Sequence, residues 1–219
     1  MRSKNFFFIA VVLILISVLI YLISTNGGRG YTWNENYKEL SKSPYGLVVF
    51  FKLLKEQAKA EKFTLLKKRV QKSLPTEPTE KSNYLFIGAG QFLDSADVQT
   101  LLKFVYNGND AFISTQVLPF RLMNKLYPQT CREDKWESLN YYQDRGVEAN
   151  FLHPDLRGNK PYNFTYRTTA PDSIYDWHFF DRGYFCDDPD GFVALGQLNG
   201  SKTNFVRIRY GLGHFYLHS

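Results

Sequence analysis

Few residues in this chain have the types and spacing that catalysis requires, and the most suggestive is a short glycine motif. Gly88-Ala89-Gly90 follows an apolar run and precedes a helical pattern, as the turn of a dinucleotide-binding unit does. Leu93 stands where the third glycine would be, and no acidic residue follows the next predicted strand at 114–115 to bind a ribose. We therefore predict a tight strand-to-helix turn at 88–90 and no cofactor.

A catalytic nucleophile would be expected on a sharp turn between a strand and a helix. The predicted strand ends offer Ser114 and Thr115, but the sequence contains no G-x-[SC]-x-G motif. Ser114 combined with His153 or His178 would form a dyad, yet a chain with 4 histidines and many serines offers such pairs by chance. We assign no catalytic residue.

Metal ligation is not indicated either. His214 and His218 are four positions apart on a predicted strand, so their side chains share a face but lie about 13 Å apart, too far for one zinc ion. The run 187–191 (DDPDG) is rich in carboxylates but lacks the glutamate of a calcium loop. We interpret this run as a β-turn and predict no metal site.

Aromatic residues dominate positions 129–190, which show no helical periodicity and read as an insertion of loops and short strands. Exposed Trp and Tyr next to Asp and Asn can stack on sugars or anchor a protein partner. We expect most of these aromatic side chains to fill a second small core and a few to be exposed. The candidates for interaction are Trp136, Tyr141, Tyr142 and Trp177.

The rest of the chain after residue 42 alternates between strand and helix patterns. Apolar runs at 84–87 and 111–114 each precede an amphipathic stretch, and further strand patterns lie at 192–195, 205–208 and 214–217. Because this alternation is typical of a parallel sheet with crossover helices, we predict an α/β domain over 43–219 with a mostly parallel sheet. The final strand pattern reaches the last residues, which indicates a chain truncated at its C-terminus.

The N-terminal segment is strongly apolar. Residues 6–23 carry no charge and are long enough to cross a bilayer, and no small-residue cleavage site follows them. We predict an uncleaved transmembrane anchor within 1–24, a linker over 25–42, and an α/β domain outside the cytoplasm. The formal net charge of +6 is diffuse, so a nucleic-acid partner is not expected.

The cysteines, Cys131 and Cys186, lie at the two ends of the aromatic insertion. Outside the cytoplasm two free thiols would be unusual, and a bond between them would tie the ends of the insertion together. We predict a disulfide here. The alternative is two buried, unpaired thiols, which would suit a cytoplasmic domain.

Several short motifs resemble those of one family. The chain contains TW at 32–33, SPYG at 43–46, FIG at 86–88, FVYNGND at 104–110, AFIS at 111–114 and RYGLGHFYLHS at 209–219. Together these resemble the membrane-anchored, Bacteroidetes-type members of the family called domain of unknown function 4350. The resemblance implies a three-layer, class I glutamine amidotransferase-like (flavodoxin-like) fold, no assigned activity, and partners in a membrane system linked to a MoxR-type ATPase.

Two functions remain open from the sequence. The first is a membrane-anchored, non-catalytic interaction module of a membrane assembly. The second is a cell-envelope enzyme or glycan-binding protein that uses the aromatic insertion. A polar pocket with buried titratable groups at the C-terminal ends of the strands would favour the second, whereas a filled sheet end would exclude it.

Overall fold

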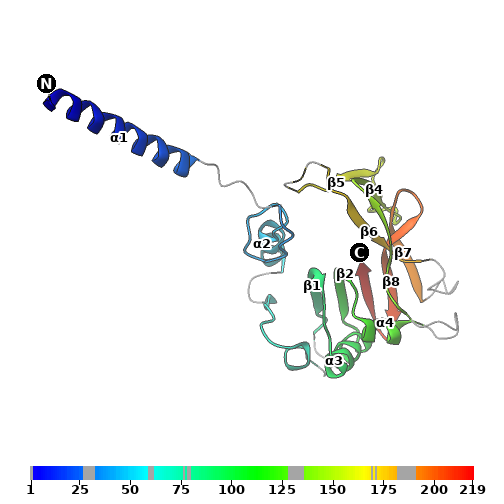
Figure 1. The fold of residues 1–219 in the computed structure, drawn as a ribbon. Coiled ribbons are helices and arrows are strands. Elements are labelled where there is room, and N and C mark those ends of the chain that lie inside the picture. Colours follow the sequence, from blue (N-terminus) through cyan, green and yellow to red (C-terminus); the bar gives the residue numbers. More distant parts are fainter. Residues whose placement is uncertain are drawn as a thin grey trace.

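The computed structural model describes residues 2–26, 33–58, 62–75, 77, 80–127, 136–168, 170, 172–181 and 191–219. Its helices are α1 (Arg2–Asn26), α2 (Val48–Gln57), the short 3-10 helix η2 (Val70–Lys72), α3 (Ser95–Tyr106) and α4 (Phe120–Leu126). Its strands are β1 (Asn83–Gly90), β2 (Asp110–Val117), β3 (Asn140–Asp144), β4 (Gly146–Phe151), β5 (Tyr162–Thr165), β6 (Tyr175–Phe179), β7 (Phe192–Leu198), β8 (Lys202–Tyr210) and β9 (Gly213–His218) (Figure 1).

A mixed 7-stranded sheet forms the centre of the molecule, in the order β1-β2-β9-β8-β7-β4-β5. β1 pairs with β2 and β2 with β9 in parallel, whereas β9–β8, β8–β7, β7–β4 and β4–β5 are antiparallel. β3 and β6 form a separate 2-stranded antiparallel sheet. Figure 1 shows the C-terminal ends of β1, β2 and β9 at one edge of the sheet.

The predicted mostly parallel, three-layer, glutamine amidotransferase-like fold is therefore wrong. Strand–helix alternation predicts parallel neighbours only where a helix crosses over, and here that applies to β1-α3-β2-α4. β7, β8 and β9 are joined by short turns, which impose antiparallel pairing. The aromatic insertion adds β4 and β5 to the same sheet, also antiparallel.

The glycine motif does not form the predicted turn. Gly88 and Gly90 lie inside β1, opposite Thr115 and Val117 of β2. The strand continues to Gly90 because β2 offers it a parallel partner along this whole length. Helix α3 then begins at Ser95, where the Asp94 carboxylate accepts hydrogen bonds from the backbone N–H groups of Ala96 and Asp97.

The core lies on the face of the sheet that α3 and α4 cover. Successive side chains of a strand point to opposite faces, and in β2 and β9 every second residue is buried. The fully buried members of this core include Leu101, Phe104, Ile113, Leu122, Phe215 and Leu217. The opposite face of β2 and β9 presents Phe112, Ser114, Gln116, Tyr216 and His218, which are only partly buried.

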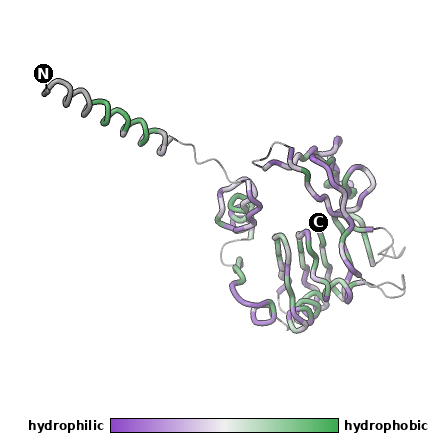
Figure 2. The backbone as a smooth tube through the Cα atoms, in the orientation of Figure 1, coloured by the Kyte–Doolittle hydropathy of each residue, from purple (hydrophilic) through white to green (hydrophobic). Residues whose placement is uncertain are grey.

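The predicted transmembrane helix over 6–23 is also corrected. Figure 2 shows an apolar middle section of α1, in contrast to the hydrophilic segment that precedes β1. Within the described part of the chain, no helix has both the length and the hydropathy needed to cross a membrane.

Candidate functional site

A pocket of about 320 Å³ opens at the C-terminal edge of the parallel strands. In open sheets with parallel strands, ligands commonly bind at this edge. The sheet contributes Gly88 from β1, Ser114 from β2 and His218 from β9, and the separate sheet contributes Tyr175 and Trp177 from β6. The remaining lining residues are Tyr37, Ile87, Thr115, Gln116, Val147, Ala149, Phe164, His178, Leu198, Asn204 and Ser219.

Ser114 and His218 are direct neighbours in the parallel register of β2 and β9. The Ser114 Oγ atom lies 2.9 Å from His218 Nδ1, and the Asn204 Nδ2 atom lies 3.3 Å from His218 Nε2. Asn204 belongs to β8, so the imidazole connects three adjacent strands. Each of these side chains is neutral yet able to donate and accept hydrogen bonds.

Burial lowers the pKa of His218 to about 4. The imidazole is therefore neutral at pH 7, and it is a weak base compared with a histidine tuned for catalysis near neutral pH. The Asn204 amide donates to Nε2 in this arrangement, so Nδ1 carries the proton and donates to Ser114. Ser114 also lies in a regular strand rather than on a sharp turn. The trio thus offers neutral groups that can donate and accept hydrogen bonds.

Aromatic rings from β6 form another part of the pocket lining. The Tyr175 and Trp177 rings are 4.7 Å apart at an interplanar angle of 65°, and the Tyr166 ring lies 4.5 Å from that of Tyr175. The Trp177 indole N–H donates to the backbone carbonyl of Asp144 at 3.0 Å, which fixes the orientation of the ring. The pocket thus has a rigid aromatic side and a hydrogen-bonding side.

A partly buried hydrogen-bond network supports the Tyr175 ring. Glu35 accepts hydrogen bonds from the Tyr37 hydroxyl at 3.0 Å and from the Gln116 amide at 3.1 Å. The Gln116 amide also donates to the Tyr175 hydroxyl. Burial, together with the nearby Glu35 carboxylate, raises the pKa of Tyr175 to about 12, and the pKa of Tyr37 is also raised, first by burial. Both phenols therefore stay protonated and can donate hydrogen bonds.

The side chains that line the pocket are uncharged at neutral pH. Among its described lining residues there is no Asp, Glu, Lys or Arg. Burial lowers the pKa of His178 as it does that of His218. The side chains of this pocket can therefore form hydrogen bonds with a neutral polar ligand.

The predicted interaction residues separate into different environments. Trp136 is only 1% exposed and belongs to the core, so it is unavailable at the surface. Tyr141 is 59% exposed, and Tyr142 lies under the Lys202 ammonium group, 4.7 Å from the ring centre. Of the predicted four, only Trp177 lines the pocket. Cys131 and Cys186 lie outside the described residues, so their disulfide stays a prediction.

The serine–histidine pair that the sequence suggested is replaced by a different one. Ser114 pairs with His218. His178 lines the same pocket but is not the partner of Ser114, and His153 lies at the surface beside Asp155. The other strand histidine, His214, faces Asp110 with its Nδ1 3.3 Å from a carboxylate oxygen. In the described residues, no cluster of three or more His, Cys, Asp or Glu has a metal-binding arrangement.

Sequence analysis missed His218, Asn204, Gln116 and the Glu35–Tyr37 pair as site residues. His218 could have been found, since Ser114 and His218 each come near the C-terminal end of a predicted strand. The partners Glu35 and Gln116 are 81 positions apart, and no local pattern connects them.

Comparisons with known proteins identify no relative by sequence. No family model matches the chain, and no curated protein matches it. The resemblance to the domain of unknown function 4350 family, the partners it implies and a location outside the cytoplasm therefore stay predictions.

Solved structures show a distant likeness. An exo-β-1,4-mannosidase from Opitutaceae bacterium strain TAV5 has 16% identity and a TM-score of 0.42, covering 86% of this chain and 30% of that protein. A β-galactosidase from Bacillus circulans sp. alkalophilus has 10% identity and a TM-score of 0.37, covering 62% and 19%. A cytoplasmic protein from Salmonella typhimurium has 12% identity and a TM-score of 0.40, covering 68% and 65%. The chain thus spans only part of each, and at these TM-scores the likeness does not extend to function.

Proposed function

We propose that this protein is a glycan-binding protein whose pocket at the C-terminal edge of β1, β2 and β9 holds a neutral sugar unit. The observation that carries the proposal is the pairing, in one pocket, of neutral hydrogen-bonding groups with rigid aromatic rings. Sugars present both hydroxyl groups and apolar ring faces, so they match such a lining.

The size and shape of the pocket favour a glycan-binding protein over a protein-interaction module. Specific protein interfaces bury roughly 800 Å² on each partner, usually around a central apolar patch. This pocket is instead small and concave, and its lining includes Ser114, Asn204 and His218. A ligand with several hydroxyl groups can replace the water that these side chains would otherwise bind.

The test is titration of the full chain with a panel of neutral oligosaccharides, monitored by tryptophan fluorescence and calorimetry. We expect at least one neutral sugar to bind, and Trp177→Ala to weaken that binding by about tenfold or more. Ser114→Ala, which changes little but one hydroxyl group, should weaken it by several-fold. Tyr162→Ala removes an exposed ring of β5 that does not line the pocket and should bind like the parent.

Circular dichroism melting curves establish that each variant is folded. The proposal fails if no neutral saccharide binds, or if folded Trp177→Ala and Ser114→Ala both bind as tightly as the parent chain.

A further inference from the structure

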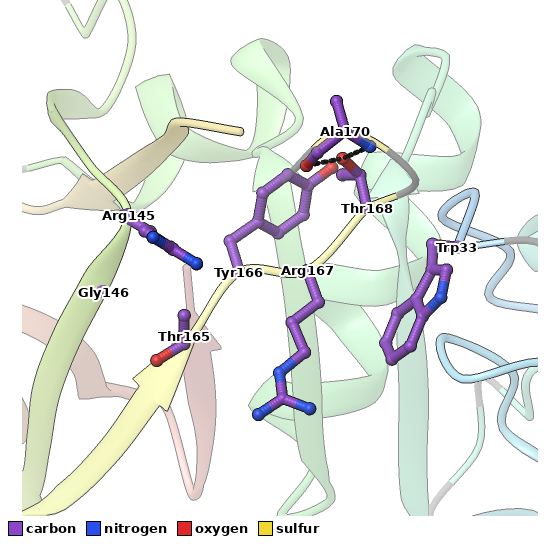
Figure 3. A pocket seen from close by; sticks show the side chains of 8 residues that line it. All are labelled: Trp33, Arg145, Gly146, Thr165, Tyr166, Arg167, Thr168 and Ala170. Carbon is purple, nitrogen blue, oxygen red and sulfur yellow. Dashed lines mark hydrogen bonds between the residues drawn. The ribbon is translucent and has the colours of Figure 1, made fainter. Parts of the chain in front are cut away.

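A second, more open pocket of about 640 Å³ lies next to the first. We call it the arginine groove, and it is lined by Trp33, Arg145, Gly146, Thr165, Tyr166, Arg167, Thr168 and Ala170 (Figure 3). The start of β4 and the end of β5 form its floor, because Gly146 pairs with Thr165. Figure 3 shows Tyr166 between the Arg145 and Arg167 side chains, with Trp33 beyond Arg167.

The groove carries two positive charges with no matching negative charge. Neither the Arg145 nor the Arg167 guanidinium forms an ion pair or hydrogen bond with another described residue. The nearest acid in sequence, Asp144, accepts a hydrogen bond from the Gly146 backbone N–H at 3.3 Å. No acidic residue lines the groove in the described part of the chain. The guanidinium groups are therefore available to an anion.

The backbone that carries these arginines is held in place. The Tyr166 N–H donates to the Arg145 carbonyl at 2.9 Å. The Tyr45 hydroxyl donates to the Arg167 carbonyl at 2.8 Å and accepts from the Arg167 N–H at 3.2 Å. The Tyr45 ring stacks on that of Tyr166 at 5.9 Å and 29°. The backbone of both arginines is thus held next to the stacked Tyr45 and Tyr166 residues.

The groove and the neutral pocket share a boundary. Tyr166 lines the groove, Tyr175 lines the pocket, and their ring centres are 4.5 Å apart. A ligand that fills the pocket can therefore continue over this pair of rings into the groove.

We propose that the arginine groove binds the carboxylate of an acidic sugar in the same glycan whose neutral unit occupies the pocket. This inference rests on the proposed function and specifies its ligand. A guanidinium group donates two parallel hydrogen bonds to a carboxylate, which makes arginine well suited to recognise such an anion. Trp33, Tyr166 and the stem of Arg167 offer apolar surface to the sugar ring.

The test compares acidic oligosaccharides with their uncharged methyl esters, which keep the same rings. Calorimetry with oligomers of galacturonate, glucuronate and mannuronate should find at least one acid that the full chain binds about tenfold more tightly than its ester. Arg145→Gln/Arg167→Gln should abolish that preference. Arg157→Gln/Arg209→Gln removes the same charge from two exposed arginines that do not line the groove, and it should keep the preference.

The outcomes separate the two proposals. If no acid binds more tightly than its ester while neutral sugars bind in a Trp177-dependent way, the groove inference is wrong and the proposed function stands. If no neutral saccharide or ester binds at all, the proposed function itself is wrong. If inorganic phosphate displaces the acidic oligomer at equal concentration, the groove is a general anion site and the sugar assignment is overturned.

Discussion

The His218 ring uses both of its nitrogens, and neither partner is charged. Nδ1 faces the Ser114 hydroxyl and Nε2 faces the Asn204 amide. Because the ring is largely enclosed and both of its hydrogen-bond partners are uncharged, the positive form of the imidazole is strongly disfavoured in the folded protein. The low pKa of about 4 follows from this burial.

We predict that the protein loses stability as the pH falls from 7 to 5, and that His218 causes much of the loss. In the unfolded chain His218 has its ordinary pKa of 6.5, whereas the folded value is about 4. The unfolded chain therefore takes up a proton first as the pH falls, which costs the folded state about 2 kcal/mol by pH 5. The lowered pKa of His178 acts in the same direction.

Urea denaturation at pH 7 and pH 5 measures this effect. His218→Gln keeps a hydrogen-bond donor and acceptor but has no titrating group, so its stability should fall by about 2 kcal/mol less than that of the parent chain. Equal losses in the two proteins would show that His218 does not carry the pH dependence.

At the scale of elements, one turn joins the β7–β8 hairpin to the aromatic insertion. Asn199 and Gly200 both have positive φ angles, 47° and 72°, within a turn that the Ser201 N–H closes by donating to the Leu198 carbonyl at 3.1 Å. The Asn199 amide oxygen accepts from the Glu148 N–H, and its amide nitrogen donates to the Tyr142 hydroxyl, each at 2.9 Å. Asn199 thus connects the turn to β4 and β3.

We predict that Asn199→Ala lowers the free energy of unfolding by about 1–2 kcal/mol. The alanine would keep neither side-chain hydrogen bond and would be strained at positive φ. Gly200→Asn is the matched control, because asparagine tolerates positive φ and nothing lies within 4 Å of an added Cβ. Its stability should stay within about 1 kcal/mol of the parent in urea denaturation. A larger loss in the control than in Asn199→Ala would contradict this account.

At the scale of the whole molecule, the insertion shares one core with the rest of the sheet. Trp136, Leu139 and Phe180 belong to the same buried cluster as Leu101 and Phe215. The Trp136 and Phe180 rings lie 6.4 Å apart within it. These three side chains of the insertion therefore depend on the central sheet for their burial.

We predict that the insertion and the central sheet unfold together. Tryptophan fluorescence and far-ultraviolet circular dichroism should give coincident urea transitions, since one contiguous core unfolds cooperatively. Trp136→Ala should lower the free energy of unfolding by about 3–5 kcal/mol, whereas the exposed Tyr141→Ala should change it by about 0.5 kcal/mol or less. Two separate transitions would show that the insertion is an independent unit.

Local sequence patterns predicted the elements whose stability depends on nearby residues. The strand patterns at 84–87 and 111–114 are confirmed by β1 and β2, and the amphipathic stretches that follow them by α3 and α4. Caps, apolar stripes and turn residues act within a few positions, so they can be read directly from the chain. The strands were found for the same reason, but a strand pattern does not encode the direction of its partner.

Only the tertiary structure decided the sheet order and the site. Ser114 and His218 are 104 positions apart and meet because β2 and β9 pair in parallel. The arginine groove depends in the same way on the β4–β5 register, which places Gly146 opposite Thr165. Residue types and local spacing determined which strands and helices form here. The long-range pairing of strands determined which side chains converge, because a hydrogen-bonded ladder can bring together residues that are distant in the chain.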